Sequence, residues 1–262
     1  MSIRIVTLGK ITALLIILSL GLPIPSQAAV YWEDSFEPGK TGFSLAGGMS
    51  YTTNPLHSGS QALKENFCNA DTSQCGSYSH RTFPASSEVY SRFYFRMQSG
   101  FKVSSIGTKM INFDGGSPSG GKRHNFWVEM RYGNTNLSLI ASGIPVNGAY
   151  SAKAYNSSFS FSPDKWYCVE THIKENTPNV ANGLIEFWVN GSQVLYAPNQ
   201  MFMQTGINAT DEKLTLSTLY VQLGYGYLYW DDIAVGNTKI GCGGSQLADS
   251  SPPLSPVGVA VK

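Results

Sequence analysis

Charged residues are scarce in this chain: Lys, Arg, Asp and Glu make up 13% of its 262 residues, and the formal net charge is +1. Such a chain has no bulk attraction to nucleic acid or to an anionic membrane, so we expect neither as a partner. Amphipathic patterns long enough for a substantial helix are also lacking. Aromatic residues (12%) and 27 glycines are abundant instead, which favours many strands and turns.

Long apolar runs are lacking too, apart from one near the N-terminus. Residues 11–22 contain only apolar residues, Thr, Ser and Gly, and they follow Arg4 and Lys10. Together with the small residues Ser26 and Ala28, at positions −3 and −1 of a cleavage site before Ala29, this pattern predicts a secretory signal peptide over residues 1–28. An uncleaved membrane anchor is the alternative, although the run is short for a bilayer span. We expect a mature chain that is extracellular or periplasmic, monomeric and without a transmembrane segment.

Only four cysteines are present, and none of them forms the C-x₂-C spacing of a zinc site. Export to an oxidising compartment favours disulfides. Four cysteines allow three connectivities, between which the sequence does not choose. We expect Cys68–Cys75, which flank a short polar loop, and Cys168–Cys242.

Strict alternation of side chains is clearest between Lys165 and Val194. Residues 167, 169, 171 and 173 form one face of an expected strand, and the polar residues 170, 172 and 174 form the other. Asn190-Gly191 lies between two further alternating runs and is typical of a tight hairpin turn. Similar short segments recur along the chain, including Ser58–Leu63. The sequence therefore predicts an all-β, two-sheet antiparallel sandwich over residues 29–242, followed by a Gly/Ser/Pro-rich tail at 243–262.

Several motifs carry a resemblance to a known fold family. They are Trp166, Glu170, Lys174, Asn176-Thr177-Pro178, Asn182-Gly183, Trp188-Val189-Asn190-Gly191, the closing run at 228–235 and the opening Phe36-Glu37-Pro38-Gly39. Over roughly Val30–Cys242 the chain resembles concanavalin A-like lectin/glucanase domains, in particular their laminin-G-like and polysaccharide-lyase branches. The resemblance implies a β-jelly-roll whose concave sheet handles carbohydrate.

Paired carboxylates, which retaining glycoside hydrolases need at a fixed separation, are missing from the expected strands. The glucanases of this fold carry such a pair on one strand. Here Glu129, Glu170 and Glu186 are isolated from one another. Glycoside hydrolysis by this mechanism is therefore disfavoured.

Lytic β-elimination of a uronic-acid polymer is a second possibility. It needs a group that neutralises the substrate carboxylate, a base and an acid. Alginate-lyase-type members of the fold carry, in order, an Arg/Glu/Arg strand, a Gln-x-His strand and a Tyr-x-Lys-x-Gly strand. In this chain Arg92, Tyr94 and Arg96 resemble the first, but Tyr94 replaces the acid. No Gln-x-His lies near Asn112, and Gln222 replaces the lysine of the third strand.

If the chain is a lyase, this resemblance assigns charge neutralisation to Arg92 and Arg96. Proton transfer is then expected from Tyr220 or His172, with His124 as an alternative.

Non-catalytic glycan binding is the third possibility, and it needs aromatic platforms and planar polar groups on one open face. The candidate binding residues are Tyr94, Lys109, Asn125, Trp127, Glu129, Arg131, Glu170, Trp188 and Gln222. Because no complete acid/base set is evident, the main interpretation is a lectin-like protein that binds a polysaccharide on its concave face. A polysaccharide lyase and a non-catalytic structural cell-surface domain are the alternatives.

Calcium is the one cofactor that the sequence suggests. The opening and closing motifs resemble those of calcium-containing carbohydrate-binding modules with the same topology. Glu37 near the first strand, with Asp231 and Asp232 on the last, would supply the oxygen ligands that this ion prefers. We expect a structural calcium site there.

Overall fold

The computed structural model describes most of the chain that follows the expected signal peptide. The described residues are 30–39, 42–43, 45, 47–67, 78–103, 108–115, 124–130, 136–146, 149–201, 214–220 and 224–243. They contain no helix, and hence none long and apolar enough to cross a membrane. The strands are β1 (Val30–Asp34), β2 (Met49–Thr52), β3 (Ala62–Phe67), β4 (Tyr78–Ser86), β5 (Glu88–Met97), β6 (Lys102–Val103), β7 (Thr108–Gly115), β8 (His124–Met130), β9 (Asn136–Val146), β10 (Ala149–Ser160), β11 (Trp166–Lys174), β12 (Gly183–Val189), β13 (Ser192–Gln200), β14 (Leu214–Tyr220) and β15 (Gly224–Gly236).

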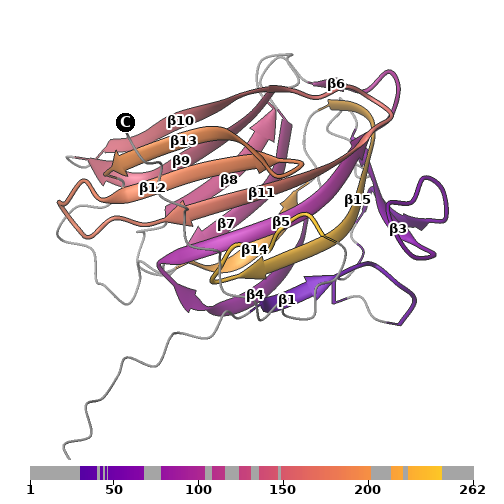
Figure 1. The fold of residues 1–262 in the computed structure, drawn as a ribbon, viewed down its shortest axis with the longest axis horizontal. Coiled ribbons are helices and arrows are strands. Elements are labelled where there is room, and N and C mark those ends of the chain that lie inside the picture. Colours follow the sequence, from indigo (N-terminus) through magenta and orange to yellow (C-terminus); the bar gives the residue numbers. More distant parts are fainter. Residues whose placement is uncertain are drawn as a thin grey trace, which may run out of the picture.

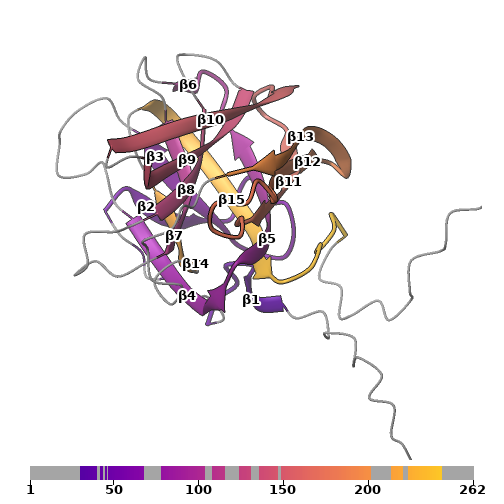
Figure 2. The same ribbon diagram turned by 90° about the vertical axis from the view of Figure 1, so that its left-hand side faces the viewer.

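These strands form two antiparallel sheets, which lie as two layers in Figures 1 and 2. Among the described residues, one sheet has nine strands in the order β13-β12-β11-β5-β15-β3-β2, with β1 and β6 also paired to β15. The other has six strands in the order β10-β9-β8-β7-β14-β4. This confirms the predicted two-sheet sandwich of jelly-roll type.

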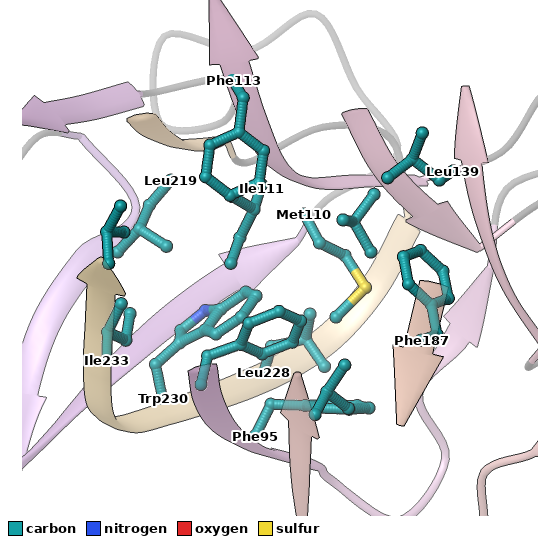
Figure 3. Packing of buried hydrophobic residues seen from close by; sticks show 14 of the residues in the cluster. Phe95, Met110, Ile111, Phe113, Leu139, Phe187, Leu219, Leu228, Trp230 and Ile233 are labelled. Carbon is teal, nitrogen blue, oxygen red and sulfur yellow. The ribbon is translucent and has the colours of Figure 1, made fainter. Parts of the chain in front are cut away.

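The hydrophobic core lies between the sheets (Figure 3). Phe95, Phe187 and Trp230 from the nine-stranded sheet face Met110 and Phe113 from the six-stranded sheet, and all five side chains are fully buried. Since successive side chains of a strand point to opposite faces, the polar residues between them lie on the two outer faces. Any open site on a sheet must therefore be built from those intervening residues.

The hairpin predicted at Asn190-Gly191 is confirmed. These residues join β12 to β13 with φ angles of 49° and 81°, a left-handed conformation that Asn and Gly tolerate best. The alternation predicted for β11 is confirmed as well. Val169 and Ile173 lie in the core cluster, whereas Glu170 lies on the opposite face and bonds to the C-terminal segment.

The strand predicted at Ser58–Leu63 is wrong in its first half. Residues 57–60 bend, and β3 begins only at Ala62. The backbone N–H groups of residues 57, 58, 60 and 61 donate to the carboxylates of Asp231 and Glu37. These amides are thus occupied by side chains instead of by a neighbouring strand.

Residues 237–243, which we call the strap, follow β15 and lie on the outer face of the nine-stranded sheet. A disulfide joins Cys242 to Cys168 of β11 (Cα–Cα 5.8 Å), which confirms this predicted pairing. The backbone N–H groups of Ile240 and Gly241 donate to one carboxylate oxygen of Glu170, at 3.0 and 2.6 Å. The strap is therefore anchored both covalently and by hydrogen bonds.

Candidate functional site

The predicted site residues divide between the two sheets instead of gathering in one trough. Arg92 and Trp188 lie on the nine-stranded sheet, in β5 and β12, whereas Trp127 lies on the six-stranded sheet, in β8. The prediction of a single shared face is therefore wrong. Alternation along each strand identified the outward residues, but it does not specify the sheet that the strand joins.

On the nine-stranded sheet, Arg92 and Tyr94 of β5 form hydrogen bonds with backbone oxygens of the protein's own C-terminal part. Arg92 is 3% exposed, and its guanidinium donates to the backbone oxygens of Asp232 (3.1 Å) and Gly243 (3.3 Å). The hydroxyl of Tyr94 donates to the backbone oxygen of Cys242 at 2.5 Å. In this arrangement the two side chains hold the strap, which argues against their predicted contact with substrate.

Trp188 and Glu170 are engaged by the strap in the same way. The ammonium group of Lys239 lies 4.0 Å from the centroid of the Trp188 ring, and that tryptophan is 8% exposed. Glu170 accepts the two strap N–H groups described above. Neither is an open platform for a sugar.

His172 is enclosed by side chains of its own sheet. Its Nδ1 lies 2.6 Å from Glu186 Oε2 and its Nε2 lies 2.9 Å from Glu88 Oε1, while Tyr90 stacks on the ring at 3.9 Å. The histidine is 3% exposed. Both ring nitrogens are already occupied by carboxylates, which disfavours a role in proton transfer to a bound polymer.

Arg96, the last member of the predicted row, forms an ion pair with Asp164 at 3.0 Å. About a quarter of its side chain is exposed, as is about half of the Asp164 side chain. Such a surface pair contributes about 0–1 kcal/mol. Arg96 lies on the same outer face as Arg92, and hence away from the six-stranded sheet.

The outer face of the six-stranded sheet brings together a different part of the predicted set. Asn112 of β7 pairs with Trp127 of β8, and Lys109 of β7 pairs with Glu129 of β8. The Lys109 ammonium lies 4.3 Å from the Trp127 ring centroid, and the indole N–H of Trp127 donates to Glu129 Oε2 at 3.1 Å. A cation, a ring and a carboxylate are thus in direct contact on this face.

The row continues into β9 and β10. Ser138 pairs with Glu129 across β8 and β9, and its hydroxyl donates to Asn156 Oδ1 at 2.7 Å. On the other side of Lys109, the side chain of Asn112 donates to Asp114 Oδ2 at 2.8 Å. A polar band therefore runs across four adjacent strands.

Electrostatics at Lys109 favour a reactive amine. Burial lowers the pKa of the Lys109 ammonium, and the carboxylates of Glu129 and Asp114 oppose that shift. A lysine whose ammonium is partly desolvated gives up its proton more easily and can act as a base nearer neutral pH.

Two further predicted residues extend this face at the level of the backbone. Tyr220 ends β14 opposite Tyr78 of β4, two residues beyond Thr218, which pairs with Asn112. Asn125 of β8 pairs with Asp114 of β7. Both belong to the sheet that carries Lys109.

Some predictions fall outside the described residues. They concern Arg131, Gln222, the Cys68–Cys75 pair, the signal peptide at 1–28 and most of the tail at 243–262. Among described residues, our reasoning missed Asp114, Ser138 and Asn156. Asp114 lies two residues from Asn112 on one strand, so alternation was the available signal for it. Ser138 and Asn156 join this face only through strand pairing with Glu129 and with each other, for which the sequence carries no signal.

The acids predicted to bind calcium surround the loop at residues 57–61. Asp231 Oδ2 accepts the backbone N–H groups of His57 and Ser58, and Asp232 Oδ2 lies 2.8 Å from His57 Nδ1. Glu37 accepts two N–H groups and the Ser60 hydroxyl from the other end of the same loop. Burial, with a smaller contribution from neighbouring Asp232, raises the pKa of Asp231 to about 6. Two adjacent desolvated acids fit a cation, although N–H donors already occupy part of their oxygen atoms. Among the described residues, the possible ligand atoms within 4.8 Å of one another belong to His57, Asp231 and Asp232, so the predicted Glu37 lies outside this group.

Comparison with known proteins agrees with this architecture. None of the curated protein sequences matches the chain. Among solved structures, the endo-β-1,4-glucuronan lyase of the fungus Trichoderma reesei is similar, with a TM-score of 0.62 and 14% identity over 80% of this chain and 96% of that one. The marine PL-14 alginate lyase of Aplysia kurodai gives a TM-score of 0.59 with 19% identity, covering 80% of this chain and 100% of its own. The cellulose-induced protein Cip1 gives 0.52 with 19% identity, covering 81% and 100%.

At these identities the structural matches establish the fold. The family assignment comes from the sequence itself, because the polysaccharide lyase family profile matches residues 31–238, which is nearly the whole domain. The chain therefore belongs to the polysaccharide lyase family.

Proposed function

We propose that this protein is a secreted lyase that cleaves a uronate-containing polysaccharide by β-elimination on the outer face of the six-stranded sheet. One observation carries the proposal: Lys109, an amine whose pKa is lowered by burial, lies in contact with Trp127 and beside Glu129 on a face that continues across four strands. Family membership supports the reaction class.

β-Elimination at a uronate removes the proton at C5, forms a C4–C5 double bond and expels the oxygen at C4. In our proposal the neutral amine of Lys109 takes the C5 proton. Tyr220, on the neighbouring strand β14, returns a proton to the departing oxygen. The Asn112 amide, which donates to Asp114, stabilises the charge that develops on the substrate carboxylate.

This proposal does not give Arg92 and Arg96 the catalytic role that the resemblance suggested for them. Arg92 donates to two backbone oxygens and Arg96 pairs with Asp164, both on the opposite sheet. Only Tyr220 keeps its predicted role, and Lys109 changes from a binding residue to the base.

The test is to incubate the mature protein with polyglucuronate, with alginate and with a neutral cellulose derivative, and to follow ultraviolet absorbance of the unsaturated product. We expect absorbance to rise with one of the acidic polymers and to stay flat with the neutral one, which has no carboxylate to acidify C5. Retention of the protein on an acidic polymer without any product from either would instead support the lectin-like interpretation. The family match favours the lyase over that interpretation.

We also propose a structural calcium ion held by Asp231 and Asp232, without the predicted Glu37, which lies outside the group of close ligand atoms. The supporting observation is that Asp231 and Asp232 are adjacent and largely buried, and that a carboxylate oxygen of each lies within 4.8 Å of the other and of a His57 ring nitrogen. A bound ion would keep Asp231 ionised and stabilise the loop. Removing calcium with EGTA should lower the unfolding midpoint and re-addition should restore it, while elemental analysis reports the ion directly. An unchanged midpoint in a protein free of calcium would reject the site.

A further inference from the structure

A cavity opens on the outer face of the nine-stranded sheet, at the edge formed by β2. It encloses about 390 Å³, which lies within the range of about 300–1,000 Å³ common for small-molecule sites. Its lining comes from β2, β3, β15 and the turn before β2: Gly47, Gly48, Met49, Ser50, Lys64, Asn66 and Tyr227. None of these residues has a part in the proposed catalysis.

Strand register places the polar members of this lining on one face. Ser50 pairs with Lys64 across β2 and β3, and Asn66 pairs with Tyr227 across β3 and β15. The alternate residues of β3, Leu63, Glu65 and Phe67, are buried on the opposite face of the strand. The cavity therefore faces outward and lies on the other side of the sandwich from Lys109.

The same sheet face is divided between this cavity and the strap. The strap contacts Arg92, Tyr94 and Glu170, which lie on β5 and β11. The cavity lies at the far side of β15, on β3 and β2. The cavity lining and the strap-binding residues therefore lie on different strands of this face.

Charge distinguishes this cavity from the Lys109 face. The Lys64 ammonium lies 3.8 Å from the centroid of the Tyr227 ring, which fixes the cation at the cavity wall. Among the described residues that line the cavity there is no carboxylate, whereas Lys109 has Glu129 and Asp114 as charged neighbours. The Lys64 cavity thus has a net positive wall and suits an anion.

We propose that this cavity is a second, non-catalytic binding site for an anionic polysaccharide. Lys64 would pair with a uronate carboxylate, the amide of Asn66 and the hydroxyl of Ser50 would bond sugar hydroxyls, and the glycines at 47 and 48 leave the backbone accessible to the chain. The inference rests on the proposed function only for the choice of polymer. A protein with this site holds the polymer on one face while cleaving it on the other.

The experiment measures the affinity for polyglucuronate and alginate by titration calorimetry in a Lys109→Gln background, where the polymer is not consumed. Lys64→Gln is compared with Lys239→Gln, a lysine that also lies on an aromatic ring of the same sheet but outside the cavity. We expect Lys64→Gln to weaken binding about tenfold, as for loss of a hydrogen bond to a charged group, and Lys239→Gln to have no effect. Asn66→Ala is the second variant, because it leaves the lysine–tyrosine contact intact, and it should weaken binding severalfold.

Two results would overturn the site: affinity that is the same in Lys64→Gln, Asn66→Ala and Lys239→Gln, or equal binding of a neutral polymer in all of them. In the protein with Lys109 restored, Lys64→Gln should raise KM for long polymers and leave kcat and the turnover of short oligosaccharides unchanged. Failure of the proposed lyase activity shows itself separately, as absence of unsaturated product with polymer binding still dependent on Lys64.

Discussion

The two outer faces of this sandwich carry similar side chains and use them differently. Each has a lysine held over a tryptophan ring, Lys239 with Trp188 on the nine-stranded sheet and Lys109 with Trp127 on the six-stranded sheet. On the first face that pair fastens the strap, together with Glu170. On the second face it belongs to a polar band that extends over adjacent strands. The same residue types thus stabilise the fold on one face and, in our proposal, take part in catalysis on the other.

Replacing the lysine of each pair with glutamine, one at a time, is the most direct test of whether the two faces differ in function. We expect Lys109→Gln to lower kcat/KM about 10²–10⁴-fold, because the amide cannot accept the C5 proton. Lys239→Gln should leave kcat/KM unchanged. Initial rates of absorbance increase on an acidic polymer measure both. Equal losses in the two variants would mean that the faces do not differ in function.

Removing the disulfide tests how much the strap contributes to the free energy of unfolding. The double variant C168S/C242S opens a loop of 74 residues, and the chain-entropy model predicts a loss of about 4 kcal/mol of unfolding free energy. Urea denaturation under oxidising conditions measures it. Since the strap is anchored to β5 and β11 of the nine-stranded sheet, away from Lys109, kcat of the folded variant should stay close to that of the parent. A large fall in kcat without unfolding would contradict this prediction and show that the strap affects catalysis on the opposite face.

The core-side carboxylate Glu65 offers a way to separate stability from activity. Burial raises the pKa of Glu65 to about 8, and its bond from the Trp230 indole N–H at 2.6 Å only partly offsets that shift. The folded protein therefore holds this proton more tightly than the unfolded chain does. Its contribution to stability is complete below about pH 4.5 and is lost as the pH rises through 8.

We expect Glu65→Gln to stabilise the protein at pH 8 by on the order of 2 kcal/mol, with little effect at pH 5. Urea denaturation at the two pH values tests this. A lysine base should become more active across the same pH interval, so the variant reveals the rate increase without the competing loss of folded protein. If Glu65→Gln is equally stable relative to the parent at both pH values, Glu65 does not titrate as described.

The smallest effect on stability is expected at Arg96, on the outer face of the nine-stranded sheet. Arg96→Gln removes an exposed ion pair with Asp164 and should change the unfolding free energy by less than about 1 kcal/mol. The rate on acidic polymers should not change. A loss of more than tenfold in kcat would restore the arginine to the catalytic role that the family resemblance first suggested.

The structure shows where reasoning from the sequence succeeded and where it failed. Alternation at Val169 and Ile173, the Asn190-Gly191 turn and the pairing of Cys168 with Cys242 were all predicted and are confirmed. The outward direction of Arg92 was also predicted, but its enclosure by Asp232 and Gly243 was not. That contact joins residues about 140 to 150 positions apart, for which the local pattern carries no signal.

The amino-acid sequence by itself determined the inward and outward faces of β11 and the tight hairpin between β12 and β13, because these follow from interactions within a few residues. The tertiary structure alone decided that β5 joins one sheet and β7 the other, and that the strap lies over Arg92 while Lys109 stays on the opposite face. Strand pairing of this kind depends on burying large side chains from distant parts of the chain in one core, so the division between the two faces is a property of the whole fold.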